Sequence, residues 1–245
     1  MSMNAELTIV IPAKNEARNL PHLLTSLSRQ DYPLLPATRV FVADAGSTDA
    51  TIETALSFSG RLLISVIPGG LPSIGRNAGA RRATTPYVLF VDADIELPDP
   101  TLLRRAMEKM KSKQLHCLTT DIRCKDGRLM DELMFRGNNA VQHFASFTKP
   151  FATGMFMLFD RAKFNELGGF DEGVHYAEDY HLSKQVSPLR FGIVKGHILT
   201  SNRRFRAMGH KKIVKMFLTT AFHTFDRSYF LRDHGYWKYE VDSGR

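Results

Sequence analysis

Residues 87–94, Tyr-Val-Leu-Phe-Val-Asp-Ala-Asp, decide the fold of this chain. Five apolar residues in a row are typical of a short strand buried on both faces, and two carboxylates follow it directly. In extended chain the side chains of Asp92 and Asp94 point to the same side, with Cα atoms about 6.6 Å apart. Such a pair suits a hard divalent cation that also binds phosphate oxygens, although a turn or a helix cap uses the same residues.

Upstream of this segment, short apolar runs alternate with stretches of helical spacing. We expect strands at Leu7–Ile11, Val40–Ala43 and Leu62–Ile67, and helices at Asn19–Gln30, Thr51–Phe58 and Asn77–Ala83. Apolar strands separated by helices predict an α/β fold with a mostly parallel sheet covered on both faces. Ligands bind beyond the carboxyl ends of such strands. The residues to examine are therefore those that follow each strand: Pro12–Glu16, Asp44–Asp49, Gly69–Asn77 and Asp92–Asp94.

Downstream of Asp94 the alternation weakens. We expect helices at Thr101–Lys111, Arg161–Leu167 and Glu178–Gln185, strands at Cys117–Arg123, Phe151–Asp160 and Phe191–Thr200, and a mixed, Met- and Phe-rich segment at Gly127–Thr148. Because the sequence contains no linker and no internal repeat, we expect a single domain over residues 1–245. This domain has a first half at about 7–112, a second half at about 113–205 and a basic C-terminal segment at about 206–245.

The C-terminal segment predicts a long amphipathic helix at Lys211–Phe230. One face of it carries apolar side chains: Val214, Phe217, Leu218, Ala221, Phe222, Phe225 and Tyr229. Such a face packs on the core in most proteins, and the alternative is that it docks on anionic lipid. The last residues, His234–Arg245, are expected to be loosely ordered unless Trp237 is docked.

Charge and composition narrow the class of protein. The 245 residues carry a formal net charge of +8, and residues 201–245 hold 10 Lys and Arg against 4 Asp and Glu. Six of the eight net charges therefore lie in the last 45 residues, where phosphates, nucleic acid or anionic lipid could be bound. Cys117 and Cys124 form no redox or zinc motif. Without a signal peptide or an apolar run near ~20 residues, a cytoplasmic or membrane-surface protein is expected.

Several functions are excluded by missing motifs. Gly70 and Gly75 have the spacing of a P-loop, but Arg76-Asn77 stands where Lys followed by Ser or Thr is required. No G-x-G-x-x-G follows a strand, so a dinucleotide oxidoreductase has no support. A sugar nucleotidyltransferase is expected to carry a Gly-rich loop of the form G-x-G-T-R after its first strand. This chain has Pro12-Ala-Lys-Asn-Glu16 there instead, which does not match. A nucleic-acid binder would not place carboxylates at strand ends, where they repel the phosphate backbone.

Taken together, the ordered motifs resemble a family 2 glycosyltransferase. They are Ile11-Pro-Ala-Lys-Asn-Glu16, Val42-Ala-Asp-Ala-Gly-Ser-Thr-Asp49, Gly75-Arg-Asn-Ala-Gly79, Phe90-Val-Asp-Ala-Asp94, Thr153-Gly154, Leu167-Gly-Gly-Phe-Asp-Glu172 and Glu178-Asp179. The similarity covers roughly residues 7–200. It implies a GT-A fold, in which a nucleotide-binding α/β half is merged with a smaller acceptor-binding half.

The resemblance also implies a role for each matching residue. Asp44 would contact the nucleotide base, Pro12, Asn15 and Glu16 would border the nucleotide, and Arg76 would contact its diphosphate region. Asp92 would face the ribose, and Asp94 would hold Mn²⁺ or Mg²⁺. Asp179 would be the catalytic base, and Glu178 with Thr153 and Gly154 would shape the acceptor and diphosphate region. Arg203 and Arg204 are candidates to stabilise the leaving diphosphate, or else they belong to a solvated turn.

The pattern departs from the family at three points. Many members carry two acidic residues where this chain has Asp44-Ala45. The Gln-x-x-Arg-Trp motif and transmembrane helices of processive relatives are missing, which favours transfer of a single sugar. Ser201-Asn202 stands where many GT-A enzymes have a metal-ligating His, and His197 is expected to pack within a strand. We expect a UDP-sugar donor first and GDP-mannose second, and a lipid-linked or saccharide acceptor. The alternative is a catalytically inactive scaffold that binds nucleotide sugars.

Overall fold

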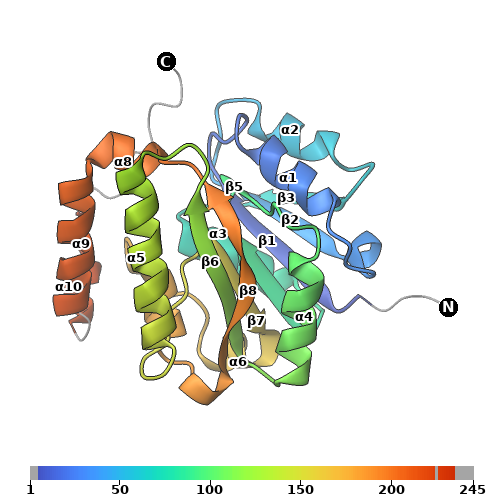
Figure 1. Ribbon diagram of the computed structural model, residues 1–245. Coiled ribbons are helices and arrows are strands. Elements are labelled where there is room, and N and C mark those ends of the chain that lie inside the picture. Colours follow the sequence, from blue (N-terminus) through green and yellow to red (C-terminus); the bar gives the residue numbers. More distant parts are fainter. Residues whose placement is uncertain (1–4, 224–225, 235–245) are drawn as a thin grey trace.

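The computed structural model describes residues 5–223 and 226–234, in which eight strands form one sheet (Figure 1). The strands are β1 (Leu7–Ala13), β2 (Arg39–Asp44), β3 (Leu63–Pro68), β4 (Tyr87–Val91), β5 (Ile95–Glu96), β6 (Cys117–Cys124), β7 (Phe156–Asp160) and β8 (Phe191–Thr200). Their order is β3-β2-β1-β4-β7-β6-β8-β5. β3, β2, β1 and β4 are parallel, β7 is antiparallel to both neighbours, and β6 and β8 are again parallel. The expected mostly parallel sheet is confirmed.

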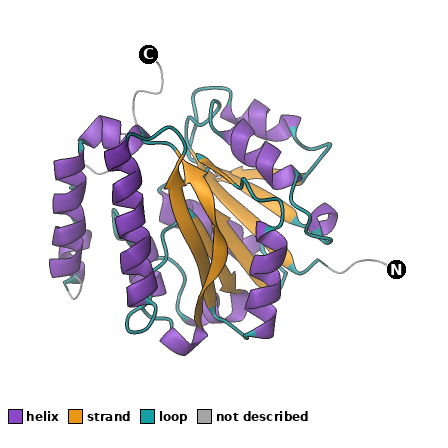
Figure 2. Cartoon of the chain, viewed as in Figure 1, coloured by secondary structure: helices purple, strands orange, loops and turns teal. Residues whose placement is uncertain are grey.

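Helices cover both faces of this sheet, as Figure 2 shows. They are α1 (Leu20–Ser28), α2 (Thr51–Ser57), α3 (Pro72–Arg82), α4 (Leu102–Ser112), α5 (Leu129–Ala145), α6 (Arg161–Glu166), α7 (Glu178–Ser183), α8 (Arg203–Met208), α9 (His210–Phe222) and α10 (Arg227–Phe230). One core contains apolar residues of α1, α2, α4 and α5, and the core on the opposite face contains those of α3, α6 and α7. Within the described ranges, no helix combines the length and the apolar character that crossing a membrane requires.

The close approach of α3 to β1 depends on a glycine. A Cβ built on Gly79 would lie 2.4 Å from Cγ1 of Val10, which is far inside van der Waals contact. Helix α3 begins at Pro72, earlier than the expected Asn77, because Pro is accepted in the first turn of a helix. Gly75, Arg76 and Asn77 therefore lie in the helix itself and face the protein interior.

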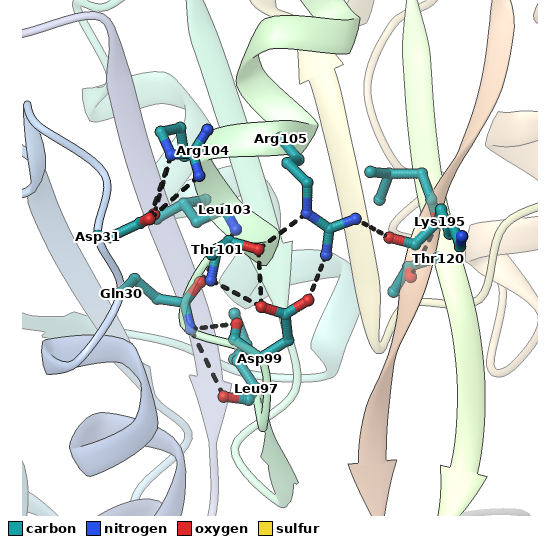
Figure 3. Close-up of polar contacts among 11 residues, drawn as sticks. Gln30, Asp31, Leu97, Asp99, Thr101, Leu103, Arg104, Arg105, Thr120 and Lys195 are labelled. Atoms are coloured by element: carbon teal, nitrogen blue, oxygen red, sulfur yellow. Dashed lines mark hydrogen bonds and ion pairs between the residues drawn. The ribbon is translucent and has the colours of Figure 1, made fainter.

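The start of α4 joins parts of the sheet that are far apart in sequence (Figure 3). The buried Gln30 side chain donates to the Asp99 carbonyl at 3.0 Å and accepts from the Leu103 N–H at 2.9 Å. Arg105 pairs with the Asp99 carboxylate and donates to the Lys195 carbonyl on β8. Helix α4 is thus tied to the end of α1 on one side and to β8 on the other.

The mixed segment at Gly127–Thr148 contains the 17-residue helix α5. Asp131 accepts from the Arg128 N–H at 2.9 Å and so caps its first turn. One face buries Phe135 and Gln142, while other apolar side chains point to solvent. Leu129, Leu133 and Phe144 recur at helical spacing on the exposed face, a regularity that the description of this segment as mixed missed.

Two expectations about segment lengths are wrong. The segment at Phe151–Asp160 is a strand only from Phe156, because the Gly154 N–H donates to Asp179 instead of to a neighbouring strand. The single helix at Lys211–Phe230 is replaced by α9 and α10. The His223 ring, next to the end of α9, stacks on Tyr229 of α10 with ring centres 4.0 Å apart.

The face of α9 that contacts the protein also differs from the expected one. Ile213 is buried and Met216 is partly buried, whereas the predicted apolar face is exposed at Val214, Phe217, Leu218 and Phe222. Of its other predicted members, Tyr229 lies on α10, while Phe225 and the side chain of Ala221 lie outside what the structure describes. The predicted disorder of His234–Arg245 concerns residues that, apart from His234, also lie outside it.

Candidate active site

Two loops at the carboxyl ends of β1 and β2 are bound to each other. Asn15, with the positive φ of 54°, accepts from the Thr48 N–H at 2.8 Å, and its own N–H donates to the Ser47 hydroxyl at 2.9 Å. The Asp44 carboxylate accepts from the N–H groups of Gly46 and Ser47, each at 3.0 Å. Asn15 and Asp44 therefore hold the shape of the edge at which a nucleotide was predicted to bind.

A second contact links this edge to the end of β8. One terminal nitrogen of Arg203 lies 2.8 Å from Glu16 Oε1 and 3.1 Å from Asp94 Oδ2. The Glu16 carboxylate also accepts from the Asn19 amide at 2.6 Å. Burial and the nearby Asp94 raise the pKa of Glu16, against the opposing effect of Arg203. Burial likewise raises the pKa of Asp94, while Arg203 lowers it and Asp92 adds to the increase. These carboxylates thus attract positive charge.

Arg76 is buried and joins two carboxylates that belong to different parts of the sheet. It is 3% exposed, and its terminal nitrogens lie 2.6 Å from Asp92 Oδ1 and 2.6 Å from Glu178 Oε1. Burial alone would lower the pKa of Arg76, but Asp92 and Glu178 raise it above its usual range. Gly154 lies against the guanidinium, since a Cβ there would come within 2.3 Å of Nη2. No larger residue fits beside Arg76 unless the guanidinium moves.

Asp179 lies at the start of α7, and both its oxygens accept backbone hydrogen bonds. Oδ2 accepts from the Gly154 N–H and Oδ1 from its neighbour Tyr180, each at 2.7 Å. Burial, with a contribution from the charge of Glu178, raises the pKa of Asp179 to about 6, although Arg76 opposes the change. Ala177 directly precedes Glu178 and Asp179 and has a φ of 61°, a conformation that non-glycine residues adopt rarely. Such backbone strain is common at functional sites.

The contacts connect most of the predicted site residues. Arg203 joins Glu16 to Asp94, Arg76 joins Asp92 to Glu178, and Gly154 joins Arg76 to Asp179. The remaining predicted residues are less engaged. Pro12 lies in β1 near Gly75, Arg204 is exposed but lies near enough to Asp94 to lower its pKa, and the buried Thr153 hydroxyl has no hydrogen-bond partner within the described residues.

Sequence reasoning missed one residue that holds the site in place. The buried Asn77 amide donates to the Phe170 carbonyl at 2.8 Å, and its oxygen accepts from the Phe170 N–H at 3.0 Å. The Phe170 ring in turn lies 5.3 Å from the Arg76 guanidinium. The place of Asn77 beside Arg76 in a short motif was the available signal, but its partner lies 93 residues away.

The ligands for a metal are incomplete in the chain alone. Within residues 5–223 and 226–234, no group of three His, Cys, Asp or Glu side chains is placed to hold an ion. His197 lies within β8 opposite Asp121, as expected, and Asn202 donates to Asp131. His210, at the start of α9, is paired with the same Asp131 at 2.6 Å.

A cavity of about 120 Å³ opens at the two carboxylates that follow β4. Its polar wall contains Asp92, Asp94, Arg203 and Arg204, and its apolar wall comes from α5, α8 and α9. A larger cavity of about 730 Å³ lies beside α3 and α7, away from these carboxylates, and none of Asp92, Asp94 and Asp179 lines it. The smaller cavity is therefore the one that the predicted chemistry requires.

The family model described as "Glycosyl transferase family 2" matches residues 8–168, about two thirds of the chain. The chain belongs to glycosyl transferase family 2. Two enzymes of Staphylococcus aureus are similar to this chain in sequence. A poly(ribitol-phosphate) beta-N-acetylglucosaminyltransferase, TarS, is 27% identical over 135 residues, which are 54% of the chain and 23% of that enzyme. A 4,4'-diaponeurosporenoate glycosyltransferase is 36% identical over 93 residues, or 36% of the chain and 24% of that enzyme. The chain thus spans less than a quarter of the length of these relatives.

Solved structures support the same fold. A mannosyltransferase from Pyrobaculum calidifontis, in complex with GDP-Man and Mn²⁺, has a TM-score of 0.66 at 20% identity, with 89% of this chain and 65% of that chain covered. TarS residues 1–349 in complex with UDP-GlcNAc have a TM-score of 0.64 at 20% identity, with 80% and 58% covered. At this identity the likeness shows the fold alone, and it confirms the expected GT-A architecture.

Proposed function

We propose that this glycosyltransferase transfers a single sugar, with inversion and with the help of a divalent metal, from a nucleotide sugar to an acceptor. The observation that carries the proposal is the pair of salt bridges of Arg76, which brings Asp92 after β4 and Glu178 at the start of α7 to one buried cation. One of the two carboxylates after β4 and the residue next to the predicted base, Asp179, thereby contact the same guanidinium. A positioned donor and acceptor supply much of the rate of such a transfer.

The donor is proposed to bind at the carboxyl edge of β1, β2 and β4. The bound loops at Asn15 and Asp44 would border the base, and Asp92 would face the ribose. A UDP-sugar is our first choice and GDP-mannose the second. The structures of family relatives with UDP-GlcNAc and with GDP-Man support a nucleotide-sugar donor without selecting between these two.

The acidic residues near Arg203 fit a divalent cation. Asp94 is proposed to hold Mn²⁺ or Mg²⁺, with substrate phosphates and water as the other ligands, because these ions accept such a mixed shell. The support is that Glu16 and Asp94 already share the positive charge of Arg203. When bound, the ion supplies positive charge next to the diphosphate as that group leaves.

The chain's own residues then account for the transfer step. An acceptor hydroxyl oxygen forms a bond to the anomeric carbon, while the bond from that carbon to the phosphate oxygen breaks. The hydroxyl proton passes to Asp179, and the electron pair leaves with the nucleoside diphosphate, near Arg203 and Arg204. A carboxylate with a pKa of about 6 is ionised at neutral pH and suited to accept that proton.

The acceptor is proposed to be lipid-linked, either a glycolipid or a polyprenyl phosphate, ahead of a soluble saccharide. The support is the basic C-terminal segment and the exposed apolar face of α9. The protein would then act at the cytoplasmic face of a membrane, and no nucleic-acid partner is proposed. If the acceptor is an ionised phosphate, no proton has to be removed and Asp179 serves mainly to orient it.

A nucleotide-release assay tests the proposal without knowledge of the acceptor. Purified protein is incubated with UDP-, GDP- and dTDP-sugars, in Mn²⁺, Mg²⁺ or EDTA, and free nucleotide is measured. We expect release from one donor that needs metal and falls roughly a hundredfold or more in Asp94→Ala. Glu166→Gln, at an exposed carboxylate on α6, is the control and should be unaffected.

The second candidate, an inactive scaffold that binds nucleotide sugars, gives a different result. Calorimetry would then detect nucleotide binding with metal, while no donor releases nucleotide. Absence of both release and binding would refute the two proposals together. The grouping of Asp92 and Glu178 at Arg76, and of Glu16 and Asp94 at Arg203, favours the enzyme.

A further inference from the structure

Exposed apolar side chains are concentrated on one part of the molecule. Fourteen large apolar residues are exposed in the described chain, and ten of them lie on α5, on the turn that follows it or on α9. The ten are Leu129, Met130, Leu133, Val141, Phe144, Phe147, Val214, Phe217, Leu218 and Phe222. A contiguous group of this kind marks an interaction surface, whereas single exposed apolar residues need no explanation.

Helix α5 carries apolar residues on two faces. Phe135 and Gln142 point to the protein and are buried. Leu129, Leu133 and Phe144 share a different face of the helix, where they are 87%, 59% and 76% exposed. An apolar helix face of this extent is ordinarily covered by another element. The outer face of α5 therefore lacks a covering element among the described residues.

Helix α9 adds a second exposed stripe of the same character. Val214, Leu218 and Phe222 follow one another at intervals of four residues, and Phe222 is 89% exposed. Lys211 and Lys215 lie three residues before Val214 and Leu218, so they flank the stripe. Lysines at the border of an apolar face can extend their stems over it and reach lipid headgroups with their ammonium groups.

The two helices meet at the candidate active site. Phe135 of α5 and Ile213, Met216 and Phe217 of α9 line the 120 Å³ cavity that opens at Asp94. In Figure 1 both helices lie on one edge of the molecule, at the side opposite α1 and α2. Both helices thus contribute to the apolar wall of a cavity whose polar wall contains Asp92 and Asp94.

We propose that the exposed faces of α5 and α9 together form a membrane-binding surface for anionic lipid, which presents a lipid-linked acceptor to the cavity at Asp94. Only the second part, presentation of the acceptor, rests on the proposed function. The sequence analysis considered lipid binding only for the C-terminal helix, so the role of α5 comes from the structure.

Charge selects anionic lipid over a second copy of this chain. Beyond the two arginines of the cavity, residues 206–222 contain four Lys and Arg and no Asp or Glu. In a two-fold dimer through this surface the same positive patch would face itself, which is repulsive. An anionic bilayer attracts it instead, and it also accepts the apolar side chains between the cations.

Vesicle flotation of the full chain tests the surface. The protein is mixed with vesicles of phosphatidylcholine alone or with equal parts of phosphatidylglycerol. We expect flotation with the anionic vesicles and loss of it in high salt. Lys211→Gln with Lys215→Gln should weaken binding by roughly fivefold for each lysine removed.

Two apolar variants separate the helices. Leu133→Ser with Phe144→Ser alters α5, and Leu218→Ser with Phe222→Ser alters α9; all four side chains are exposed, so folding is not at risk. Each pair should lower vesicle binding at least tenfold and leave the donor-only nucleotide release unchanged. Leu56→Ser with Leu189→Ser, at exposed residues elsewhere, is the matched control and should float like the parent protein.

Three results would overturn the proposal. One is absence of binding to anionic vesicles, which is also the result expected if another part of the protein already covers this surface. Another is binding that the α5 pair leaves unchanged. The third is a dimer in light scattering that the α5 pair dissociates. None of them affects donor-only nucleotide release, so failure here is distinguishable from failure of the proposed transferase activity.

Discussion

Replacement of the buried Arg76 should separate stability from catalysis. Arg76→Met leaves Glu178, which is 8% exposed, and Asp92, which is 29% exposed, without their shared cation. Loss of one partner from a buried ion pair costs about 3–5 kcal/mol, and the partial exposure of Asp92 places the expected loss near the lower value, about 3 kcal/mol. Arg81→Met is the control on the same helix, since Arg81 is 62% exposed and its pair with Glu172 contributes about 0–1 kcal/mol.

The same substitution should change the pH dependence of activity. Arg76 lowers the pKa of Asp179, so its removal allows burial and Glu178 to raise that pKa further above 6. The acid limb of the activity profile then moves to higher pH, and activity at pH 7 falls because more of the base is protonated. The pH profile of sugar transfer, or of donor hydrolysis where it shows the limb, measures this shift.

A double variant tests whether the charge or the packing is responsible. Arg76→Met with Glu178→Leu replaces the buried ion pair by apolar groups, and this should restore most of the lost stability without restoring activity. Chemical unfolding gives the stability, and the donor KM tests the separately predicted contact of Arg76 with the diphosphate. If Arg76→Met were no less stable than Arg81→Met and kept the parent pH profile, Arg76 would not organise the site.

Two further predictions follow from individual contacts. Asp179→Asn should abolish transfer to a hydroxyl acceptor. Because the pKa of Asp179 is raised to about 6 on folding, its contribution to stability is present at low pH and lost as pH rises through about 6. The stability of the variant relative to the parent should therefore increase by about 3 kcal/mol between pH 4 and pH 8, as measured by urea unfolding. Gly79→Ala places a Cβ 2.4 Å from Val10 and should cost about 1–3 kcal/mol in thermal unfolding, whereas Gly137→Ala, with no atom within 4 Å of the new Cβ, should stabilise α5 by up to about 1 kcal/mol; equal effects of the two would contradict the close packing of α3 on β1.

The strands could be predicted from the sequence because each one is determined locally. Tyr87–Val91 and Phe191–Thr200 have the predicted bounds, since a buried strand needs little more than a run of apolar residues. Local pattern was insufficient where one helix serves two environments. Helix α5 buries Phe135 and exposes Phe144, so the face on which its apolar residues are concentrated is not the face that packs on the protein.

In the candidate site, too, local sequence predicts some features, and contacts between distant residues determine the others. Sequence motifs identified Asp92 and Asp94 as candidates, because they directly follow a strand, and Arg76 and Arg203 as candidate contacts to the diphosphate. They could not predict which carboxylates these arginines pair with, because Arg76 and Glu178 are 102 residues apart and Arg203 and Glu16 are 187 residues apart. Each pair forms only when distant strands of one sheet bring their ends together. An isolated exposed arginine and a buried arginine between two acids look alike in sequence, yet they differ by several kcal/mol in what their removal costs.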